Sequence, residues 1–164
     1  MISEMSRAEA GFGMWWEEET RPRPKPRERN IVLVIDDNPF SRALTGHGLE
    51  SLGWEALLAP DVATGVAMFR ESNRRIAAVV LDLETVESDD RRVLRELRSL
   101  RRDVPLIVCG NGSAGAACRR FSDAAGADFL ARPFSHSDLH DVLHRAVRGN
   151  PARGSLTPLR ALYS

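Results

Sequence analysis

Short apolar runs alternate with longer amphipathic segments between residues 30 and 148. A continuous run of β-branched and other apolar residues is typical of a strand that is covered on both faces of a sheet. Residues 31–35 give the clearest such run, and the run at 54–58 is the weakest. The strands predicted in this way cover residues 31–35, 54–58, 76–81, 104–109 and 127–131.

Helices are predicted between these strands and after the last one, and several have recognisable ends. Asn38-Pro39 begins the first helix, because proline is favoured in a first turn, and Gly53 closes it. Asp61 caps the second helix, and Ser135 caps the last one in a variant of the capping box. The predicted helices cover residues 39–52, 62–72, 90–101, 113–125 and 136–148.

Five strands that alternate with five helices within about 120 residues predict an α/β fold, with a parallel sheet covered on both faces. Right-handed crossovers limit the topology, and we expect a doubly wound, five-stranded sheet of flavodoxin-like order. Catalytic and binding groups in such sheets gather at the carboxyl ends of the strands. The residues that follow each predicted strand are therefore the first candidates for chemistry.

The two ends of the chain differ from this central domain, which we place at residues 30–148. Residues 1–29 contain alternating prolines that fix φ and remove backbone donors, so we expect a flexible arm that ends in an extended linker. Adjacent Trp15 and Trp16 leave a docking motif open as the alternative to a disordered arm. We expect residues 149–164 to form a disordered tail.

The composition argues against a nucleic-acid-binding, membrane-spanning or disulfide-rich secreted protein. Lys plus Arg and Asp plus Glu each number 23 in 164 residues, so the net charge is zero and whole-chain attraction to nucleic acid or an anionic membrane is not expected. Lys25 is the one lysine. Two cysteines imply no disulfide framework, and no signal peptide or run of about 20 apolar residues is present. We therefore expect a soluble, cytoplasmic protein.

Three carboxylates follow two of the buried strands. Asp36 and Asp37 come after the first strand and Asp82 after the third, and these strands are neighbours in either common doubly wound order. Unpaired, such carboxylates repel one another, and a hard divalent cation such as Mg²⁺ relieves that repulsion. A carboxylate beside the metal also suits phosphoryl transfer, because the metal neutralises charge on the transferring group.

The chain resembles the receiver domain of two-component response regulators over about residues 29–148. The order and spacing of four segments carry this resemblance: Val34-Ile35-Asp36-Asp37, Val79-Val80-Leu81-Asp82, Pro105-Leu106-Ile107-Val108 and the stretch from Gly126 to Ser135. The resemblance implies that Asp82 is the phosphoacceptor. It also implies that Asp36, Asp37, Asp82 and the backbone carbonyl of Glu84 hold Mg²⁺.

The sequence departs from the family pattern where phosphorylation is sensed. Arg132 stands where the family has lysine, and Gly110 falls where the family has a threonine or serine hydroxyl. Phe129 aligns with the aromatic residue that changes rotamer, and it lacks a hydroxyl. The loop at 84–90 lacks the family's proline and glycine. An arginine is larger and planar, so its exchange for lysine is not neutral.

We therefore expect an atypical single-domain receiver that accepts a phosphoryl group on Asp82 in a His–Asp phosphorelay, in a bacterial setting. It would act by binding other proteins and not as an enzyme. Its expected partners are a histidine kinase or phosphotransfer protein and a downstream protein target, and a homodimer stays open. The alternative is a phosphorylation-independent pseudo-receiver that serves as an interaction module or scaffold, which the changes at Gly110 and Arg132 favour.

Weaker signals suggest other functions. Residues 110–115 match the GxGxxG dinucleotide pattern after a strand, but too little sequence follows to complete a binding fold. His136, His140 and His144 have a spacing that can chelate Zn²⁺, although a helix flank is the simpler interpretation. Direct DNA binding is not expected, because no helix-turn-helix follows the domain.

Two further groups of residues have simple structural interpretations. A basic stripe on the predicted helix at 90–101 is interpreted as a solvated face, with an acidic partner as the alternative. Its members are Arg91, Arg95, Arg98 and Arg102. Cys109 and Cys118 are expected to pack as small hydrophobic residues, and a redox role for Cys109 would require a lowered thiol pKa.

Overall fold

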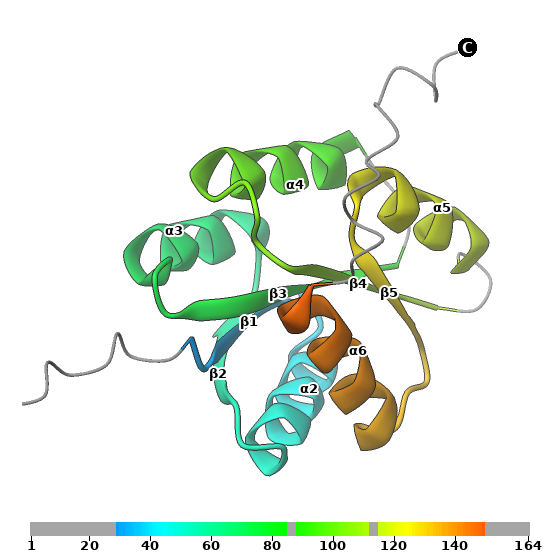
Figure 1. Ribbon diagram of the computed structural model, residues 1–164. Coiled ribbons are helices and arrows are strands. Elements are labelled where there is room, and N and C mark those ends of the chain that lie inside the picture. Colours follow the sequence, from blue (N-terminus) through cyan, green and yellow to red (C-terminus); the bar gives the residue numbers. More distant parts are fainter. Residues whose placement is uncertain (1–28, 85–87, 112–114, 150–164) are drawn as a thin grey trace, which may run out of the picture.

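A parallel sheet lies between two layers of helices in the computed structural model, which describes residues 29–84, 88–111 and 115–149 (Figure 1). The strand order is β2-β1-β3-β4-β5, which confirms the predicted flavodoxin-like topology. The strands are β1 (Ile31–Ile35), β2 (Glu55–Ala59), β3 (Ile76–Leu83), β4 (Leu106–Gly110) and β5 (Asp128–Ala131). The helices are α2 (Pro39–Ser51), α3 (Val62–Ser72), α4 (Ser88–Leu100), α5 (Gly115–Ala125) and α6 (His136–Arg148).

Each face of the sheet has its own core. Successive side chains of a strand point to opposite faces, so Leu33 joins the core under α3, α4 and α5, while Val32 and Val34 join the core under α2 and α6. Figure 1 shows these two helix layers on opposite sides of the sheet. All five residues of β1 are buried, because β1 lies between β2 and β3.

The predicted helix ends are confirmed in detail. The side chain of Asn38 accepts hydrogen bonds from the amides of Phe40 and Ser41 at 3.0 Å each, which fixes the start of α2 directly after β1. Asp61 caps α3, and Ser135 with Asp138 forms a complete capping box at α6. These caps set the short connections that lead from β1, β2 and β5 into the helices that follow them.

Some boundaries differ from the predicted ones by a residue or two. The apolar run of the third strand stops at Leu81 and the strand is predicted to end at Asp82, whereas β3 continues to Leu83, because Asp82 and Leu83 pair with Cys109 and Gly110 of β4. The apolar pattern does not reveal this extension, since Asp82 interrupts the run. The phosphoacceptor candidate is therefore held in the backbone ladder and does not lie in a loop.

Parts of the sequence-based interpretation fall outside the described residues. They include the arm with Trp15 and Trp16, the tail from residue 150, and residues 85–87 and 112–114. The predicted arm, linker and tail therefore stay predictions. No helix in the described part of the chain is long and apolar enough to cross a lipid bilayer.

Candidate acidic site at the strand ends

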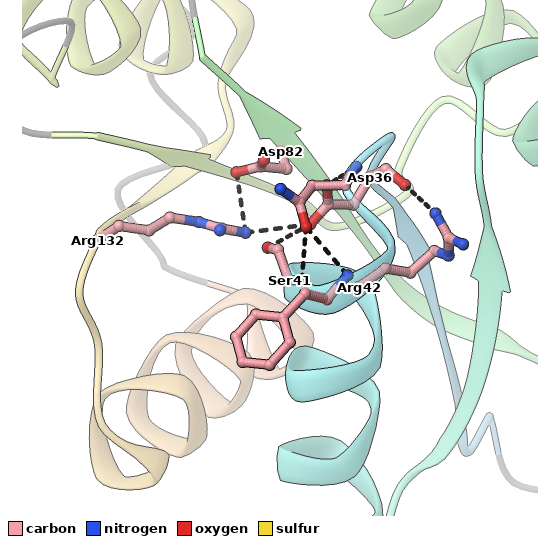
Figure 2. A network of polar contacts seen from close by, with 7 residues as sticks. Asp36, Ser41, Arg42, Asp82 and Arg132 are labelled. Atoms are coloured by element: carbon pink, nitrogen blue, oxygen red, sulfur yellow. Dashed lines mark hydrogen bonds and ion pairs between the residues drawn. The ribbon is translucent and has the colours of Figure 1, made fainter.

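The carboxyl ends of β1, β3 and β5 bring three charged side chains together (Figure 2). Asp36 follows β1, Asp82 lies near the end of β3, and Arg132 follows β5. The side chain of Asp36 is fully buried, and that of Asp82 is 9% exposed. The strand-end rule therefore predicts the location of this site and its two aspartates, whereas the position of Arg132 is implied by the family resemblance.

Arg132 links the two aspartates through one nitrogen atom. Its Nη2 lies 3.2 Å from Oδ2 of Asp36 and 3.0 Å from Oδ1 of Asp82. The side chain of Arg132 is 21% exposed, and its Nε is buried with no hydrogen-bond partner among the described residues. Arg132 is thus the counter-charge of the site, and one of its donors is left unused.

Asp36 is also bound to the first turn of α2, which sequence reasoning did not predict. The hydroxyl of Ser41 donates to Oδ2 of Asp36 at 2.6 Å, and the amide of Asn38 donates to Oδ1 at 2.9 Å. Nη1 of Arg42 donates to the backbone carbonyl of Asp36 at 2.8 Å. A polar residue five positions after a strand-end aspartate, one turn into a helix, is the signal that could have identified Ser41.

The pKa of Asp82 is raised to about 6, and burial is the main cause. The positive charge of Arg132 lowers it, while Asp36, Asp37 and Glu84 raise it further through charge repulsion. Asp36, Asp37 and Glu84 therefore lie close enough to Asp82 for their charges to act on it. At a pH one unit above its pKa, Asp82 is about nine-tenths ionised and can act as a nucleophile.

The donor chemistry of this site fits Mg²⁺. Asp37 and Glu84 are exposed beside the more buried Asp82, and one guanidinium faces several carboxylates, which leaves an excess of negative charge. In the described part of the chain, no three His, Cys, Asp or Glu side chains are placed to hold one metal ion. Mg²⁺ needs fewer, because it keeps several waters and takes one or two carboxylates.

Gly110, the last residue of β4, lies next to this site, with Phe129 of β5 and Cys118 of α5 as its neighbours. A Cβ atom on Gly110 would lie 2.9 Å from Cβ and 3.0 Å from Sγ of Cys118, and 3.3 Å from Cε2 of Phe129. The half-buried ring of Phe129 packs against the core, and the guanidinium of Arg119 lies 4.9 Å from its centroid. The space where a side chain at position 110 would stand is therefore filled by α5.

Comparison with known protein families identifies the family of this chain. Residues 32–144 match the model of the response regulator receiver domain, which covers β1 to most of α6. The chain belongs to the response-regulator receiver family. The match confirms the resemblance drawn from the strand-end motifs. Receiver domains take part in two-component signalling and interact with histidine kinases or phosphotransfer proteins.

Several curated proteins and solved structures are similar to this receiver domain. The photosynthetic apparatus regulatory protein RegA of Rhodobacter capsulatus is 28% identical over 116 residues, which is 71% of this chain and 61% of RegA. A receiver domain protein from Clostridium thermocellum has a TM-score of 0.65 at 24% identity, covering 72% of this chain and 94% of that one. The receiver domain of a Pseudomonas aeruginosa sensor histidine kinase has a TM-score of 0.62 at 27% identity, covering 73% and 98%, and was solved with magnesium in its active-site cleft.

The structure also shows where the cysteines, the histidines of the last helix and the start of the dinucleotide pattern lie in the receiver domain. Cys109 and Cys118 are buried and unpaired, as expected for small hydrophobic residues, and burial raises the pKa of the Cys109 thiol to about 12. The rings of His140 and His144 lie 4.2 Å apart on α6. The dinucleotide pattern begins at Gly110, and residues 112–114 of it lie outside the described part of the chain.

The predicted arginine stripe of the receiver domain does not act as one free basic face. Arg98 donates to the backbone carbonyls of Ala125 at 3.1 Å and Gly126 at 3.0 Å, so it binds the end of α5. Arg95 donates to the carbonyl of Arg91 within α4. At least one member of the stripe therefore joins two helices of the fold.

Proposed function

We propose that this receiver domain accepts a phosphoryl group on Asp82. The observation that carries the proposal is the contact of Arg132 Nη2 with both Asp36 and Asp82, since it places a cation against the acceptor carboxylate. A phosphoryl group brings more negative charge into a site that already holds several carboxylates, and a fixed guanidinium offsets that charge.

The transfer itself requires little of the protein beyond position and charge. An ionised Asp82 oxygen attacks the phosphorus of a phosphohistidine, a P–O bond forms and the P–N bond breaks. The electron pair of that bond stays on the imidazole nitrogen, so the donor histidine ends neutral once it exchanges protons with water. The product is an acyl phosphate on Asp82.

The guanidinium of Arg132 has an edge that suits the product. In arginine, Nε and Nη2 lie on the same edge and can donate to two oxygens of one anion. Here Nη2 contacts Asp82, and Nε is buried without a partner among the described residues. A phosphoryl oxygen can satisfy that donor. Lysine offers a single nitrogen at this position, so arginine changes how the anion is held.

We assign Mg²⁺ to the carboxylates of Asp37 and Asp82 and the backbone carbonyl of Glu84, with Asp36 in support. When bound, the ion neutralises charge on the transferring group. Arg132 would then share the acidic site with a second positive charge, which would weaken its attraction to Asp82. The magnesium reported for the Pseudomonas receiver domain supports this assignment.

The domain would act by binding other proteins and not as an enzyme. A histidine kinase or phosphotransfer protein would supply the phosphoryl group, and a downstream protein would respond to the domain, in the bacterial cytoplasm. The chain spans 61% of RegA, so the activity of a whole regulator is itself part of the proposal.

Exposure to a small phosphodonor tests this function. The domain is incubated with phosphoramidate and Mg²⁺, and the intact mass is measured. We expect an adduct of one phosphate that is stable in acid and lost in base, absent in Asp82→Asn. Asp61→Asn is the matched control, because it makes the same change at an exposed position and asparagine also caps helices well. An adduct that persists in Asp82→Asn would refute the role of Asp82.

A second function is favoured by the packing around Gly110. The family's hydroxyl is missing there, and Cys118 approaches so closely that a side chain at position 110 would force α5 or β4 to shift. The domain would then serve as an interaction module whose binding surface does not depend on phosphorylation. Amide hydrogen exchange in α5 and β5 distinguishes the two functions: unchanged exchange in a fully phosphorylated sample supports the module, and changed exchange supports a switch.

A further inference from the structure

Two side chains donate to the same oxygen of the buried Asp36. Oδ2 accepts from the Ser41 hydroxyl at 2.6 Å and from Nη2 of Arg132 at 3.2 Å, as Figure 2 shows. The other partners of Asp36 bind different atoms: the Asn38 amide binds Oδ1, and Arg42 binds the backbone carbonyl. Ser41 and Arg132 are therefore the two side chains that donate hydrogen bonds to this one buried carboxylate oxygen.

Once Asp82 carries a phosphoryl group, Arg132 cannot bind the phosphoryl oxygens and also keep its full contact with Asp36. The same nitrogen, Nη2, contacts both carboxylates at rest. If Nη2 and the unused Nε turn toward phosphoryl oxygens on Asp82, the hold of Arg132 on Asp36 weakens. A buried carboxylate that loses a charged partner is costly, unless another donor keeps its oxygen satisfied.

We propose that Ser41 is a positioning residue of the phosphoryl site: its hydroxyl holds Asp36 so that Arg132 is free to engage an oxyanion on Asp82. This rests on the proposed function of Asp82. The hydroxyl is well placed for the role, because its 2.6 Å bond is the shorter of the two to Oδ2 and because α2 is fixed at its start by the Asn38 cap. Without the hydroxyl, Asp36 retains Arg132 and competes with the oxyanion for it.

Beryllofluoride, a tetrahedral phosphoryl mimic that binds carboxylates, tests this role without turnover. It is titrated with Mg²⁺ into the folded domain, and the bound fraction is followed by fluorine NMR. We expect Ser41→Ala to weaken beryllofluoride binding by about tenfold or more, the range for a lost hydrogen bond to a charged group. Ser41→Thr keeps a hydroxyl and is expected to bind like the wild type.

Ser51→Ala is the matched control. Ser51 lies in the last turn of the same helix, where its hydroxyl donates to the carbonyl of Gly48 at 2.8 Å, far from Asp36 in the chain. It is expected to leave beryllofluoride binding unchanged. If Ser41→Ala does not fold, Ser41→Thr and Ser41→Val form a pair of equal shape that differ in the hydroxyl, and the threonine variant must bind more tightly.

The outcomes separate this inference from the proposed function. If the wild type binds beryllofluoride and Ser41→Ala binds it equally well or better, the positioning role of Ser41 is wrong while the function of Asp82 stands. Equal affinities of the threonine and valine variants would overturn the role in the same way. If the wild type binds none, the proposed function fails and this inference fails with it.

Discussion

Replacing Gly110 by alanine tests how tightly α5 packs on the end of β4. The added Cβ would lie 2.9 Å from Cβ of Cys118 and 3.0 Å from its Sγ. Carbon atoms pack best at about 3.5–4.0 Å, so the helix or the strand must shift by several tenths of an ångström. Overpacking of this kind costs about 1–3 kcal/mol in protein cores.

A gain in the unfolded state offsets part of that cost. Alanine has less conformational freedom than glycine in the unfolded chain, which stabilises the folded state by about 0.4–1 kcal/mol. We therefore expect Gly110→Ala to lower the free energy of unfolding by about 1–2 kcal/mol, which corresponds to a fall of roughly 4–8 °C in Tm. Gly110→Ser adds a larger group at the same place and is expected to lose at least as much.

Urea denaturation of four variants measures the effect and locates its cause. In a double-mutant cycle with Cys118→Ala, the alanine at 110 is expected to cost less than in the wild-type background, because the Sγ contact is gone while the Cβ contact remains. A Gly110→Ala variant as stable as the wild type would refute the packing argument. The same result would weaken the interpretation that α5 excludes a hydroxyl at this position.

Three other expectations follow from buried charges and thiols. The pKa of Asp82 rises from its ordinary 3.8 to about 6 on folding, so its contribution disfavours the folded state increasingly as the pH rises from about 4 to 6. Asp82→Asn should therefore stabilise the domain at pH 7.5, by up to about 3 kcal/mol, and much less at pH 4, measured by thermal denaturation at both pH values; a gain that is equal at both would contradict this. Cys109, whose thiol pKa is raised to about 12, should resist iodoacetamide in the folded protein at pH 8 and react after unfolding. Arg101→Met should lower the free energy of unfolding in urea by about 1–3 kcal/mol, because Nη1 of Arg101 bonds the carbonyls of Asn73 at 2.6 Å and Ile76 at 2.8 Å; a smaller loss would show that these carbonyls find water instead.

Much of the fold is predictable from local patterns. Continuous apolar runs identify β1, β3 and β4, weaker apolar runs indicate β2 and β5, and caps such as Asn38 and Ser135 place helix starts within a residue or two. The strand-end rule then brings Asp36 and Asp82 to one edge of the sheet, and the structure places Arg132, whose position the family resemblance implied, against both. The strands and caps depend on residues within a few positions of each other, and the meeting of the strand ends follows from the parallel order of the strands.

The parts that sequence reasoning missed depend on distances between elements. Nothing in the sequence near Gly110 indicates that Cys118 of α5 approaches it so closely, so the missing hydroxyl at first suggests only a lost function. Likewise, the choice of Asp36 as the partner of Ser41 is set by how α2 leaves β1. The shared contact of Arg132 with two aspartates is a matter of side-chain reach that no spacing reveals.

The most direct test of the central claim is to locate the phosphate on the chain. After reaction with phosphoramidate and Mg²⁺, borohydride reduces an acyl phosphate at aspartate to homoserine, which peptide mass spectrometry assigns to a position. We predict modification at Asp82, with Asp36 and Asp37 unmodified. Homoserine at Asp36 or Asp37, or at no aspartate while a phosphorylated control protein reacts, would contradict the account.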